Sequence, residues 1–320
     1  MCKPKVSVCI PTYRYGKYIS EALDSVLRQT FYDFELLVVD DASDDLTDQI
    51  VKRYAASDAR IRYIRHESNK GMVENWNYCL QEARGVYIKF LFGDDFFTSG
   101  ETLAKMVKIM ECDKSISLLG SSRLIVNERS VPINVWSFSR ADCVLDGAQV
   151  ISTCLLQLKN LIGEPSAVMF RKEQALRGFD VKYKQIVDLE MWFHLLEQGK
   201  YAFICEPLCA FRIHEQQQTA QNAKSNVSLI DTSYLYKEYL NNDYIDIWWL
   251  NKKYIEYNHV YNAFKSYLNN RSNRDLFLEI ANCYGVKTFF ILLPIYKIYK
   301  PFTKIKRCVA KYLMPRQARD

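Results

Sequence analysis

Residues 34–41 read Phe-Glu-Leu-Leu-Val-Val-Asp-Asp. The stretch is apolar at almost every position up to Val39, a pattern typical of a strand in a parallel sheet that helices cover on both faces. It then ends abruptly at two acidic residues, Asp40 and Asp41. We therefore expect a buried strand that carries carboxylates to the edge of a sheet.

Strand and helix patterns alternate on both sides of this stretch. Apolar runs predict strands at 6–10, 34–39, 61–65 and 86–91, and helical spacing predicts helices at 17–29, 46–56, 72–83 and 101–111. Such alternation is typical of an α/β fold with a parallel sheet, whose ligands bind beyond the carboxyl ends of the strands. The polar residues that follow these strands are therefore expected at one edge of the sheet: Thr12, Asp40, Asp41, Asn69, Asp94 and Asp95.

A second acidic pair follows the fourth predicted strand, in the sequence Phe90-Leu91-Phe92-Gly93-Asp94-Asp95-Phe96-Phe97. Two carboxylates in a partly dehydrated pocket repel each other, so the pKa of one rises strongly unless a cation lies beside them. A divalent metal or a metal-bound diphosphate would supply that cation. On these residues alone, a solvated acidic turn in which Asp95 caps the next segment is an equal alternative.

Two common nucleotide-binding motifs are absent from the sequence. It has no Gly-x-Gly-x-x-Gly after the first strand and no Gly-x-x-x-x-Gly-Lys-Ser/Thr, which argues against a dinucleotide oxidoreductase and a P-loop NTPase. A nucleotidyltransferase would need a phosphate loop rich in Gly and Lys at this point. The chain instead has Pro11-Thr12-Tyr13-Arg14-Tyr15-Gly16, which makes that class a weaker alternative.

The composition is that of an ordinary globular protein. The chain has 320 residues, 49% hydrophobic and 25% charged, enough for one large α/β domain and an appendage. No apolar run reaches the roughly 18 to 20 residues of a membrane-spanning helix, and the N-terminus enters the first strand without a secretion signal. Its ten cysteines include no Cys-x-x-Cys pair, which favours free thiols in a reducing compartment. We therefore expect a cytoplasmic protein.

The middle of the chain is less regular and contains two further candidate site residues. Short strands are predicted at 116–119, 124–127, 131–135, 201–204 and 208–213, and helices at 147–158 and from residue 188 onward. Asp188 would lie in the first helical turn, whose dipole favours an ionised carboxylate that can act as a general base; a plain N-cap is the alternative. His214 follows the last strand and is either a contact to a metal or diphosphate or a surface histidine.

The C-terminal part differs in composition from the rest. Residues 228–285 are rich in Tyr, Asn, Lys and Leu and predict helices at 234–240, 245–257 and 276–283. Residues 287–320 contain nine Lys and Arg against one acid, a balance of +8, which leaves −2 for the remainder of a chain of net charge +6. Lysines interleaved with aromatic residues fit an anionic membrane surface, and a frayed basic tail is the alternative. Nucleic acid is not expected as a partner, because no recognition module accompanies the charge.

Five motifs, in this order, resemble those of family 2 glycosyltransferases, which have the GT-A fold: Val6–Tyr13, Leu37–Ser43, Asn69–Gly71, Phe92–Asp95 and Val187–Trp192. The resemblance covers about residues 4–215. It implies a Rossmann-like, mostly parallel sheet with helices on both faces in a GT-A domain at 1–220. The nucleotide-binding half would be 1–115 and the acceptor half 116–220, followed by a helical region at 221–286 and a basic amphipathic tail at 287–320 that associates with the membrane.

The resemblance also assigns roles. Asp188 would be the catalytic base, and Asp95 would hold a Mg²⁺ or Mn²⁺ bound to the donor diphosphate, with His214 as a further candidate ligand. Asp41 would accept a hydrogen bond from a uracil-like or thymine-like ring, and Asp94 would reach the ribose. The residues expected to bind the nucleotide sugar are Pro11, Thr12, Tyr13, Asp41, Asn69, Lys70 and Asp94. The residues expected either to contact the acceptor or to support the side chains that contact a substrate are Glu164, Glu190 and Trp192.

The sequence departs from the family pattern at two positions. The family often has an acid where this chain has Phe92, which implies a metal site with fewer protein ligands. It often has Glu before the base, where this chain has Val187. The resemblance implies an inverting enzyme that transfers a sugar from a UDP or dTDP sugar to a saccharide or lipid-linked saccharide, as in the synthesis of a bacterial surface polysaccharide. Such an enzyme would lie peripherally on the inner face of the cytoplasmic membrane; a non-catalytic nucleotide-sugar-binding or scaffold protein is the alternative.

Overall fold

The computed structural model describes residues 3–214, 217 and 227–285. The chain divides into two compact units. The described residues of the first are 3–150, 160–214 and 217, and those of the second are 151–159 and 227–285. The predicted tail at 287–320 lies outside the described residues.

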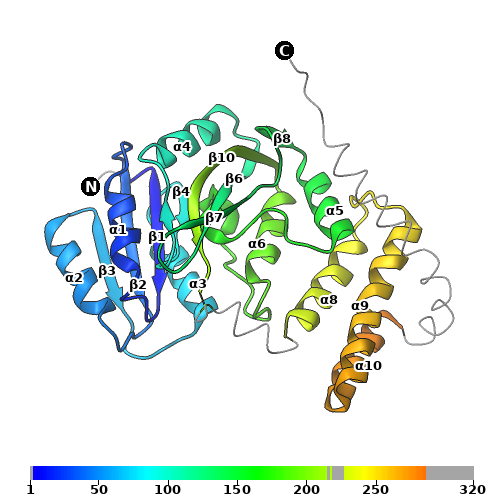
Figure 1. The fold of residues 1–320 in the computed structure, drawn as a ribbon. Helices are drawn as coiled ribbons and strands as arrows, with labels where there is room; N and C mark the ends of the chain where they lie inside the picture. Colours follow the sequence, from blue (N-terminus) through cyan, green and yellow to red (C-terminus); the bar gives the residue numbers. More distant parts are fainter. Residues whose placement is uncertain (1–2, 215–216, 218–226, 286–320) are drawn as a thin grey trace. The chain divides into compact units, whose positions relative to one another are not determined.

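One sheet of ten strands forms the centre of the first unit (Figure 1). Its main path is β3-β2-β1-β4-β9-β6-β10-β5, with β7 paired to β6 and β8 paired to β10. The strands are β1 Val6–Thr12, β2 Phe34–Asp40, β3 Ile61–Arg65, β4 Tyr87–Phe90, β5 Phe96–Phe97, β6 Ile116–Val126, β7 Pro132–Trp136, β8 Cys143–Leu145, β9 Val168–Arg171 and β10 Lys200–Arg212.

The first four strands of the chain run parallel to one another. β1 pairs with β2 and with β4, and β2 pairs with β3, all in parallel register. Thr12 at the end of β1 is therefore level with Asp40 at the end of β2, which is in turn level with Arg65 at the end of β3. This arrangement confirms the predicted α/β fold with a mostly parallel sheet, and it brings the loops after these strands to one edge.

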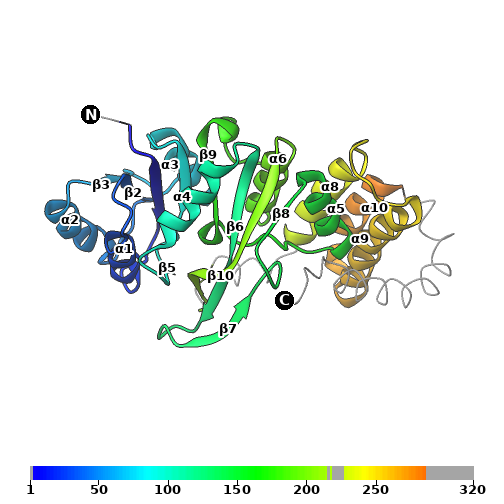
Figure 2. The ribbon, with the colours of Figure 1, turned by 90° about the horizontal axis from the view of Figure 1, so that it is seen from above.

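Helices cover this sheet on both faces. Alternate residues of β1 and β2 share a hydrophobic core with α1, α2 and α4, whereas α3 packs on β1 and β2 with residues outside that core, and α6 packs on β6 (Figure 2). The alternation arises because successive side chains of a strand point to opposite faces. The helices are α1 Ile19–Leu27, α2 Thr47–Ser57, α3 Met72–Glu82, α4 Thr102–Cys112, α5 Gly147–Gln157 and α6 Val187–Leu196, with short 3₁₀ turns η1 Pro165–Ala167 and η2 Lys172–Ala175.

The prediction of two short strands at 116–119 and 124–127 was wrong. The structure has one strand, β6, that runs without a break through Gly120, Ser121 and Ser122. These small residues interrupt the apolar pattern, but they are buried between neighbouring strands, and a Cβ on Gly120 would overlap the Tyr201 hydroxyl. Similarly, β10 is continuous from Lys200 to Arg212 and accommodates Pro207 through shifts in its register with β6.

The second unit is helical. It contains most of α5 together with α8 Val227–Leu240, α9 Trp249–Asn269 and α10 Arg274–Tyr284. Its core is built from α9 and α10, and tyrosine hydroxyls join the helices: Tyr236 donates to the Cys154 carbonyl at 3.1 Å, and Tyr284 to the Ser233 carbonyl at 2.6 Å. Among the described residues, no helix combines the length and the apolar character needed to cross a membrane.

Candidate functional site

The loop after β2 is joined to the loop after β3 by the Asp41 carboxylate. One oxygen accepts a hydrogen bond from the Lys70 backbone at 2.7 Å, and the other accepts from the Gly71 backbone at 2.9 Å. The Asn69 side chain donates to the Asp41 carbonyl at 3.3 Å. The structure therefore brings together Asp41, Asn69 and Lys70, three residues expected at the nucleotide. Each Asp41 oxygen keeps a second lone pair for a ligand.

Asp40 holds the turn that shapes this loop. Its Oδ1 accepts from the Ser43 backbone at 3.0 Å and from the Ser43 hydroxyl at 2.5 Å, and its Oδ2 accepts from the Tyr63 hydroxyl at 3.0 Å. Ala42, which lies between Asp40 and Ser43 in the turn, has a φ of 61°, in the left-handed region that residues other than glycine seldom adopt. The buried Asp40 carboxylate thus fixes the backbone that presents Asp41.

The end of β1 lies against the loop that carries the second acidic pair. A Cβ on Gly93 would lie 2.8 Å from Cδ2 of Tyr15 and 3.2 Å from the Thr12 hydroxyl oxygen, so glycine favours this close approach. Pro11 and Thr12 are buried in β1, and the Thr12 hydroxyl oxygen has no hydrogen-bond partner. Tyr13 is exposed, with the Arg14 guanidinium 5.0 Å from its ring centroid. An unsatisfied hydroxyl beside an exposed aromatic ring can bind a planar polar ligand.

The carboxylates of Asp94 and Asp95 are both buried but have different partners. Asp94 Oδ2 lies 2.9 Å from Nε2 of His214. Asp95 Oδ1 accepts a hydrogen bond from the Arg212 backbone at 2.9 Å, and its Oδ2 has no hydrogen-bond partner. His214, expected as a candidate metal ligand, thus contacts Asp94.

The free oxygen of Asp95 is the feature that fits a metal ion. Burial, reinforced by the charge of Asp94, raises the pKa of Asp95 well above its usual range. A buried carboxylate oxygen without a donor is the type of ligand that Mg²⁺ and Mn²⁺ bind. The described residues contain no group of three or more His, Cys, Asp or Glu side chains that could hold a metal ion. A cation at Asp95 would therefore be completed by phosphate oxygens and water, which agrees with the sequence departure at Phe92.

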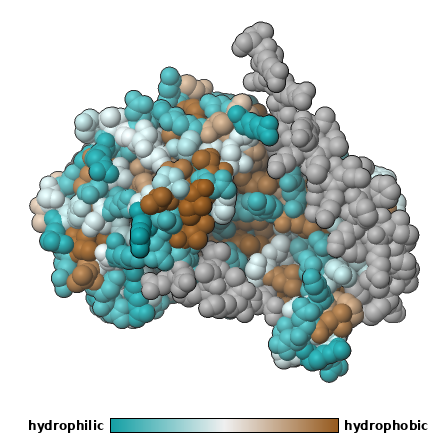
Figure 3. All heavy atoms as spheres, viewed as in Figure 1, coloured by the Kyte–Doolittle hydropathy of each residue, from teal (hydrophilic) through white to brown (hydrophobic). Residues whose placement is uncertain are grey.

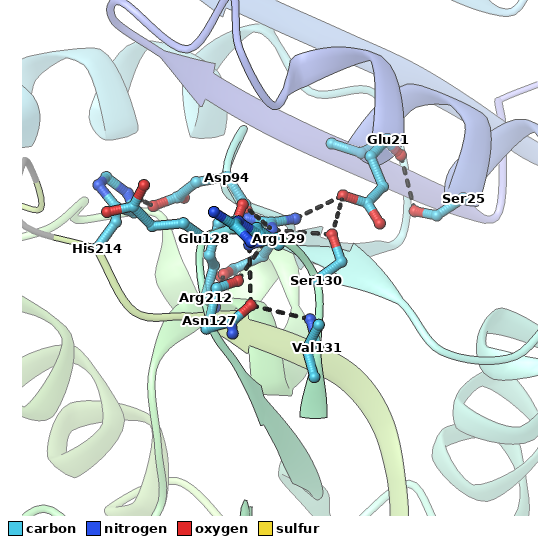
Figure 4. Close-up of polar contacts among 12 residues, drawn as sticks. Glu21, Ser25, Asp94, Asn127, Glu128, Arg129, Ser130, Val131, Arg212 and His214 are labelled. Atoms are coloured by element: carbon cyan, nitrogen blue, oxygen red, sulfur yellow. Dashed lines mark hydrogen bonds and ion pairs between the residues drawn. The ribbon is translucent and has the colours of Figure 1, made fainter. Parts of the chain in front are cut away.

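Arg212 organises this side of the site, although the sequence did not point to it. Its guanidinium is almost fully buried and contacts three segments: Nε donates to the Asp94 carbonyl at 2.7 Å, Nη2 to Glu21 at 2.6 Å, and Nη1 to the Ser130 hydroxyl at 2.9 Å. Figure 4 shows these side chains converging beside His214. Arg212 thereby ties the acidic pair to α1 and to the turn between β6 and β7.

A second buried cation, Lys89, lies beneath the acidic pair. Its ammonium donates to the Phe90 carbonyl at 2.8 Å and to the Ser166 carbonyl at 2.6 Å. Burial lowers its pKa to about 8, partly offset by the charge of Asp95. The Ser166 hydroxyl in turn accepts from the Phe92 backbone at 3.0 Å. Lys89 therefore fastens η1 to the end of β4.

Asp188 lies in the first turn of α6, as predicted. Its Oδ1 accepts from the Leu189 backbone at 2.8 Å, and its Oδ2 accepts from the Asn160 side chain at 3.2 Å. Burial, reinforced by the charge of Glu164 and partly offset by the hydrogen bond from the Leu189 backbone, raises the pKa of Asp188 to about 7. The amide at the helix start favours the charged form, but loss of water outweighs it. A carboxyl with this pKa can both take and hold a proton at neutral pH.

The charge of Glu164 acts on both candidate carboxyls of the site, Asp95 and Asp188. It forms an ion pair with the nearly buried Arg123, with 2.5 Å between its Oε2 and the arginine Nε. Its charge contributes to the raised pKa of both Asp95 and Asp188. Glu164 thus lies within electrostatic range of both the metal candidate and the base candidate.

The other two residues expected near the acceptor are buried in α6. Glu190 forms an ion pair with Arg177, with 2.6 Å between the closest atoms. Trp192 is fully buried, and its indole N–H donates to the Gly163 carbonyl at 3.0 Å. This bond holds the 160–164 loop next to Asp188. The expected role of these residues near the acceptor stays a prediction.

Sequence reasoning missed Arg212, Lys89, Asn160 and Arg123. One signal was present for Lys89, a charged residue inside a run predicted to be a buried strand. The same signal applied to Arg123 and Arg212, which lie in or beside other predicted strands. The sequence contained no such signal for Asn160, because its hydrogen-bond partner Asp188 is 28 residues away along the chain.

The chain is similar to known proteins in sequence and in fold. The sequence model described as "Glycosyl transferase family 2" matches residues 7–173, more than half of the chain. The putative teichuronic acid biosynthesis glycosyltransferase TuaG of Bacillus subtilis (strain 168) is 30% identical over 214 residues, which cover 66% of this chain and 80% of the relative.

Two solved structures share the fold. The structure of S. aureus TarS 1–349 in complex with UDP-GlcNAc has a TM-score of 0.62 at 24% identity, covering 82% of this chain and 73% of that one. The mannosyltransferase PcManGT from Pyrobaculum calidifontis, in complex with GDP-Man and Mn²⁺, has a TM-score of 0.54 at 17% identity and covers 98% of this chain and 87% of that one.

Proposed function

This chain belongs to glycosyl transferase family 2, and on that premise we propose that it transfers a sugar, with inversion, from a nucleoside diphosphate sugar of the UDP or dTDP type to a hydroxyl of a saccharide acceptor. The chain is a glycosyltransferase by its family. The observation that carries the finer proposal is that two unlike carboxyls both lie within electrostatic range of Glu164: Asp95 with a free buried oxygen, and Asp188, whose pKa burial raises to about 7.

The loops after β1, β2 and β3 would bind the nucleotide. The buried Thr12 hydroxyl oxygen has no hydrogen-bond partner in the described part of the chain, each Asp41 oxygen has a second lone pair beside the one that accepts from the backbone, and Tyr13 offers an exposed ring. A uracil or thymine ring presents one N–H donor that a carboxylate can accept. The UDP-GlcNAc bound to S. aureus TarS, which has the same fold, supports a uridine donor.

The acidic pair would hold the donor's diphosphate through a divalent cation. Asp95 Oδ2 would be the protein ligand, and His214 would keep the Asp94 carboxylate in place. When bound, Mg²⁺ or Mn²⁺ would stabilise the negative charge that develops on the departing diphosphate. The Mn²⁺ in PcManGT, which shares the fold, supports this assignment.

Asp188 would act as the base. The proton of the acceptor hydroxyl would pass to a carboxylate oxygen of Asp188 while the acceptor oxygen forms its bond to the anomeric carbon. The bond from that carbon to the diphosphate oxygen would break at the same time, so the nucleoside diphosphate leaves with the electron pair. Hydrogen bonds from Leu189 and Asn160 would hold the carboxylate in orientation for this transfer.

A donor screen tests this function. We expect the full chain, incubated with a panel of UDP, dTDP and GDP sugars, to release free nucleoside diphosphate from at least one of the first two classes, and only in the presence of Mn²⁺ or Mg²⁺. Mass spectrometry of the released nucleotide, with and without metal, gives the measurement. Binding of a nucleotide sugar without any turnover would favour a non-catalytic binding protein instead.

We further propose that the acceptor is a lipid-linked saccharide and that residues 287–320 bring the enzyme to the cytoplasmic face of the membrane. Nine Lys and Arg against one acid in this segment support attraction to anionic lipid, and the TuaG relative is named as a putative teichuronic acid biosynthesis glycosyltransferase. We expect truncation after residue 286 to move the protein from the membrane fraction to the soluble fraction. Equal partition of the two chains would refute the role of the segment.

A further inference from the structure

The short strand β7 carries an exposed aromatic residue on the same sheet face as a buried arginine. In the antiparallel pair of β6 and β7, Trp136 lies directly opposite Arg123. Residues directly opposite in such a pair have side chains on the same face. The Arg123 guanidinium lies 5.5 Å from the Trp136 ring centroid. The indole therefore rests beside Arg123.

A second aromatic ring, that of Phe211, lies beside Trp136. Phe211 of β10 is paired with Ile125 of β6, two residues beyond Arg123 and on the same face. The ring centroids of Trp136 and Phe211 are 6.1 Å apart, with an angle of 31° between their planes. Trp136 and Phe211 form an aromatic pair, and 39% of Trp136 stays exposed. Figure 3 shows apolar side chains gathered on the surface over β7, whose exposed Ile133 and Val135 lie on the face of the strand opposite to Trp136.

Contacts lead from this aromatic pair to the base candidate. Arg123 is ion-paired with Glu164, and Gly163, with a φ of 120°, leaves room for the guanidinium, because a Cβ there would lie 2.9 Å from Arg123 Nη1. The Gly163 carbonyl accepts from the Asn160 side chain at 3.3 Å, and the same side chain donates to Asp188. Through Arg123 and Glu164, the aromatic pair is therefore connected to the loop that positions Asp188.

The aromatic pair also adjoins the donor side of the site. Phe211 immediately precedes Arg212, whose backbone N–H binds Asp95. The side chains of Phe211 and Arg212 point to opposite faces of β10, so a molecule lying on Trp136 and Phe211 would lie near the end of β10 that binds Asp95 and beside Arg123, the ion-pair partner of Glu164. A sugar acceptor must reach this region, because its hydroxyl has to meet both the donor and the base.

We propose that Trp136 and Phe211 form a subsite for the acceptor saccharide, in which the C–H face of a pyranose ring stacks on the exposed indole. This inference rests on the proposed sugar transfer. A pyranose has an apolar face and a rim of hydroxyl groups. The exposed indole can pack against the apolar face, and the neighbouring charged pair of Arg123 and Glu164 can form hydrogen bonds with the hydroxyl groups. The site takes neutral saccharides, and Trp136 orients the acceptor toward Asp188.

Fluorine NMR tests the subsite without requiring turnover. The full chain is labelled with 5-fluorotryptophan at its five tryptophans, and Trp136→Phe identifies the Trp136 resonance. Methyl glycosides of glucose, galactose, mannose and N-acetylglucosamine are the probes, with glycerol as the polar control. We expect at least one glycoside to shift the Trp136 resonance while the exposed Trp248 and Trp249 stay unchanged. No shift with any glycoside, or an equal shift with glycerol, would overturn the subsite.

Kinetics with the acceptor found in a transfer assay supplies a second readout. We expect Trp136→Leu to raise the acceptor KM by about tenfold and to change the donor KM by less than about twofold. Val135→Ala, on the opposite face of the same strand, is the matched control and leaves both constants unchanged. Equal increases in the two KM values, or the same effect from Val135→Ala, contradict the proposal. If the wild-type chain transfers no sugar, the proposed function fails, and the NMR result still decides the subsite.

Discussion

Asp188→Asn is expected to lower kcat for sugar transfer by about a thousandfold and to leave the Kd of the nucleotide-sugar donor within about twofold. The amide has nearly the same shape and still accepts the hydrogen bond from Leu189 through its oxygen, but it cannot take the proton of the acceptor hydroxyl. Steady-state kinetics and donor titration by calorimetry give the two numbers.

The matched control removes a carboxylate from the other end of the same helix. Glu197 lies exposed at the C-terminus of α6, and Glu197→Gln is expected to leave kcat unchanged. If Asp188→Asn keeps more than about a tenth of the wild-type kcat, Asp188 is not the base.

The pH dependence of the wild-type enzyme gives a matching signature. A base works in its deprotonated form, so activity is absent where Asp188 is protonated and present where it is ionised. Because burial raises the pKa of Asp188 to about 7, kcat/KM should rise with pH through about 7 and level off above it. An ordinary exposed Asp would instead give a plateau from roughly pH 5 upward. A flat profile between pH 6 and 8 would contradict the assignment.

Asp95→Asn is expected to weaken Mn²⁺-dependent binding of UDP by at least about tenfold, because it removes the charge of a carboxylate whose buried Oδ2 has no hydrogen-bond partner. The amide oxygen can still accept the hydrogen bond from the Arg212 backbone, so the loop keeps its anchor. Calorimetric titration of UDP with and without Mn²⁺ separates the metal-dependent part of the affinity.

Two controls accompany this variant. Asp33→Asn removes an exposed carboxylate just before β2 and should leave UDP binding unchanged. Thermal unfolding in the absence of metal reports whether Asp95→Asn folds. An unchanged Kd for UDP in the presence of Mn²⁺, in a folded variant, would exclude Asp95 as the metal ligand.

The sequence by itself determined the fold class and one edge of the site. Apolar runs such as that ending at Val39, alternating with helical patterns, require strands buried on both faces, and parallel strands place their carboxyl ends together. Thr12, Asp41 and Asp94 could therefore be predicted to share an edge before any contact was known. Their side-chain roles depended on the resemblance to a family.

Only the tertiary structure decided the electrostatics and the connections across the chain. The pKa of Asp188 depends on burial and on Glu164, and neither can be inferred from a helix start. Arg212 meets Glu21 across 191 positions, and Trp136 meets Phe211 only because β6 lies between their strands. Periodicity in a sequence reports which face of an element is buried, whereas the neighbours of a buried charge are set by the packing of distant elements.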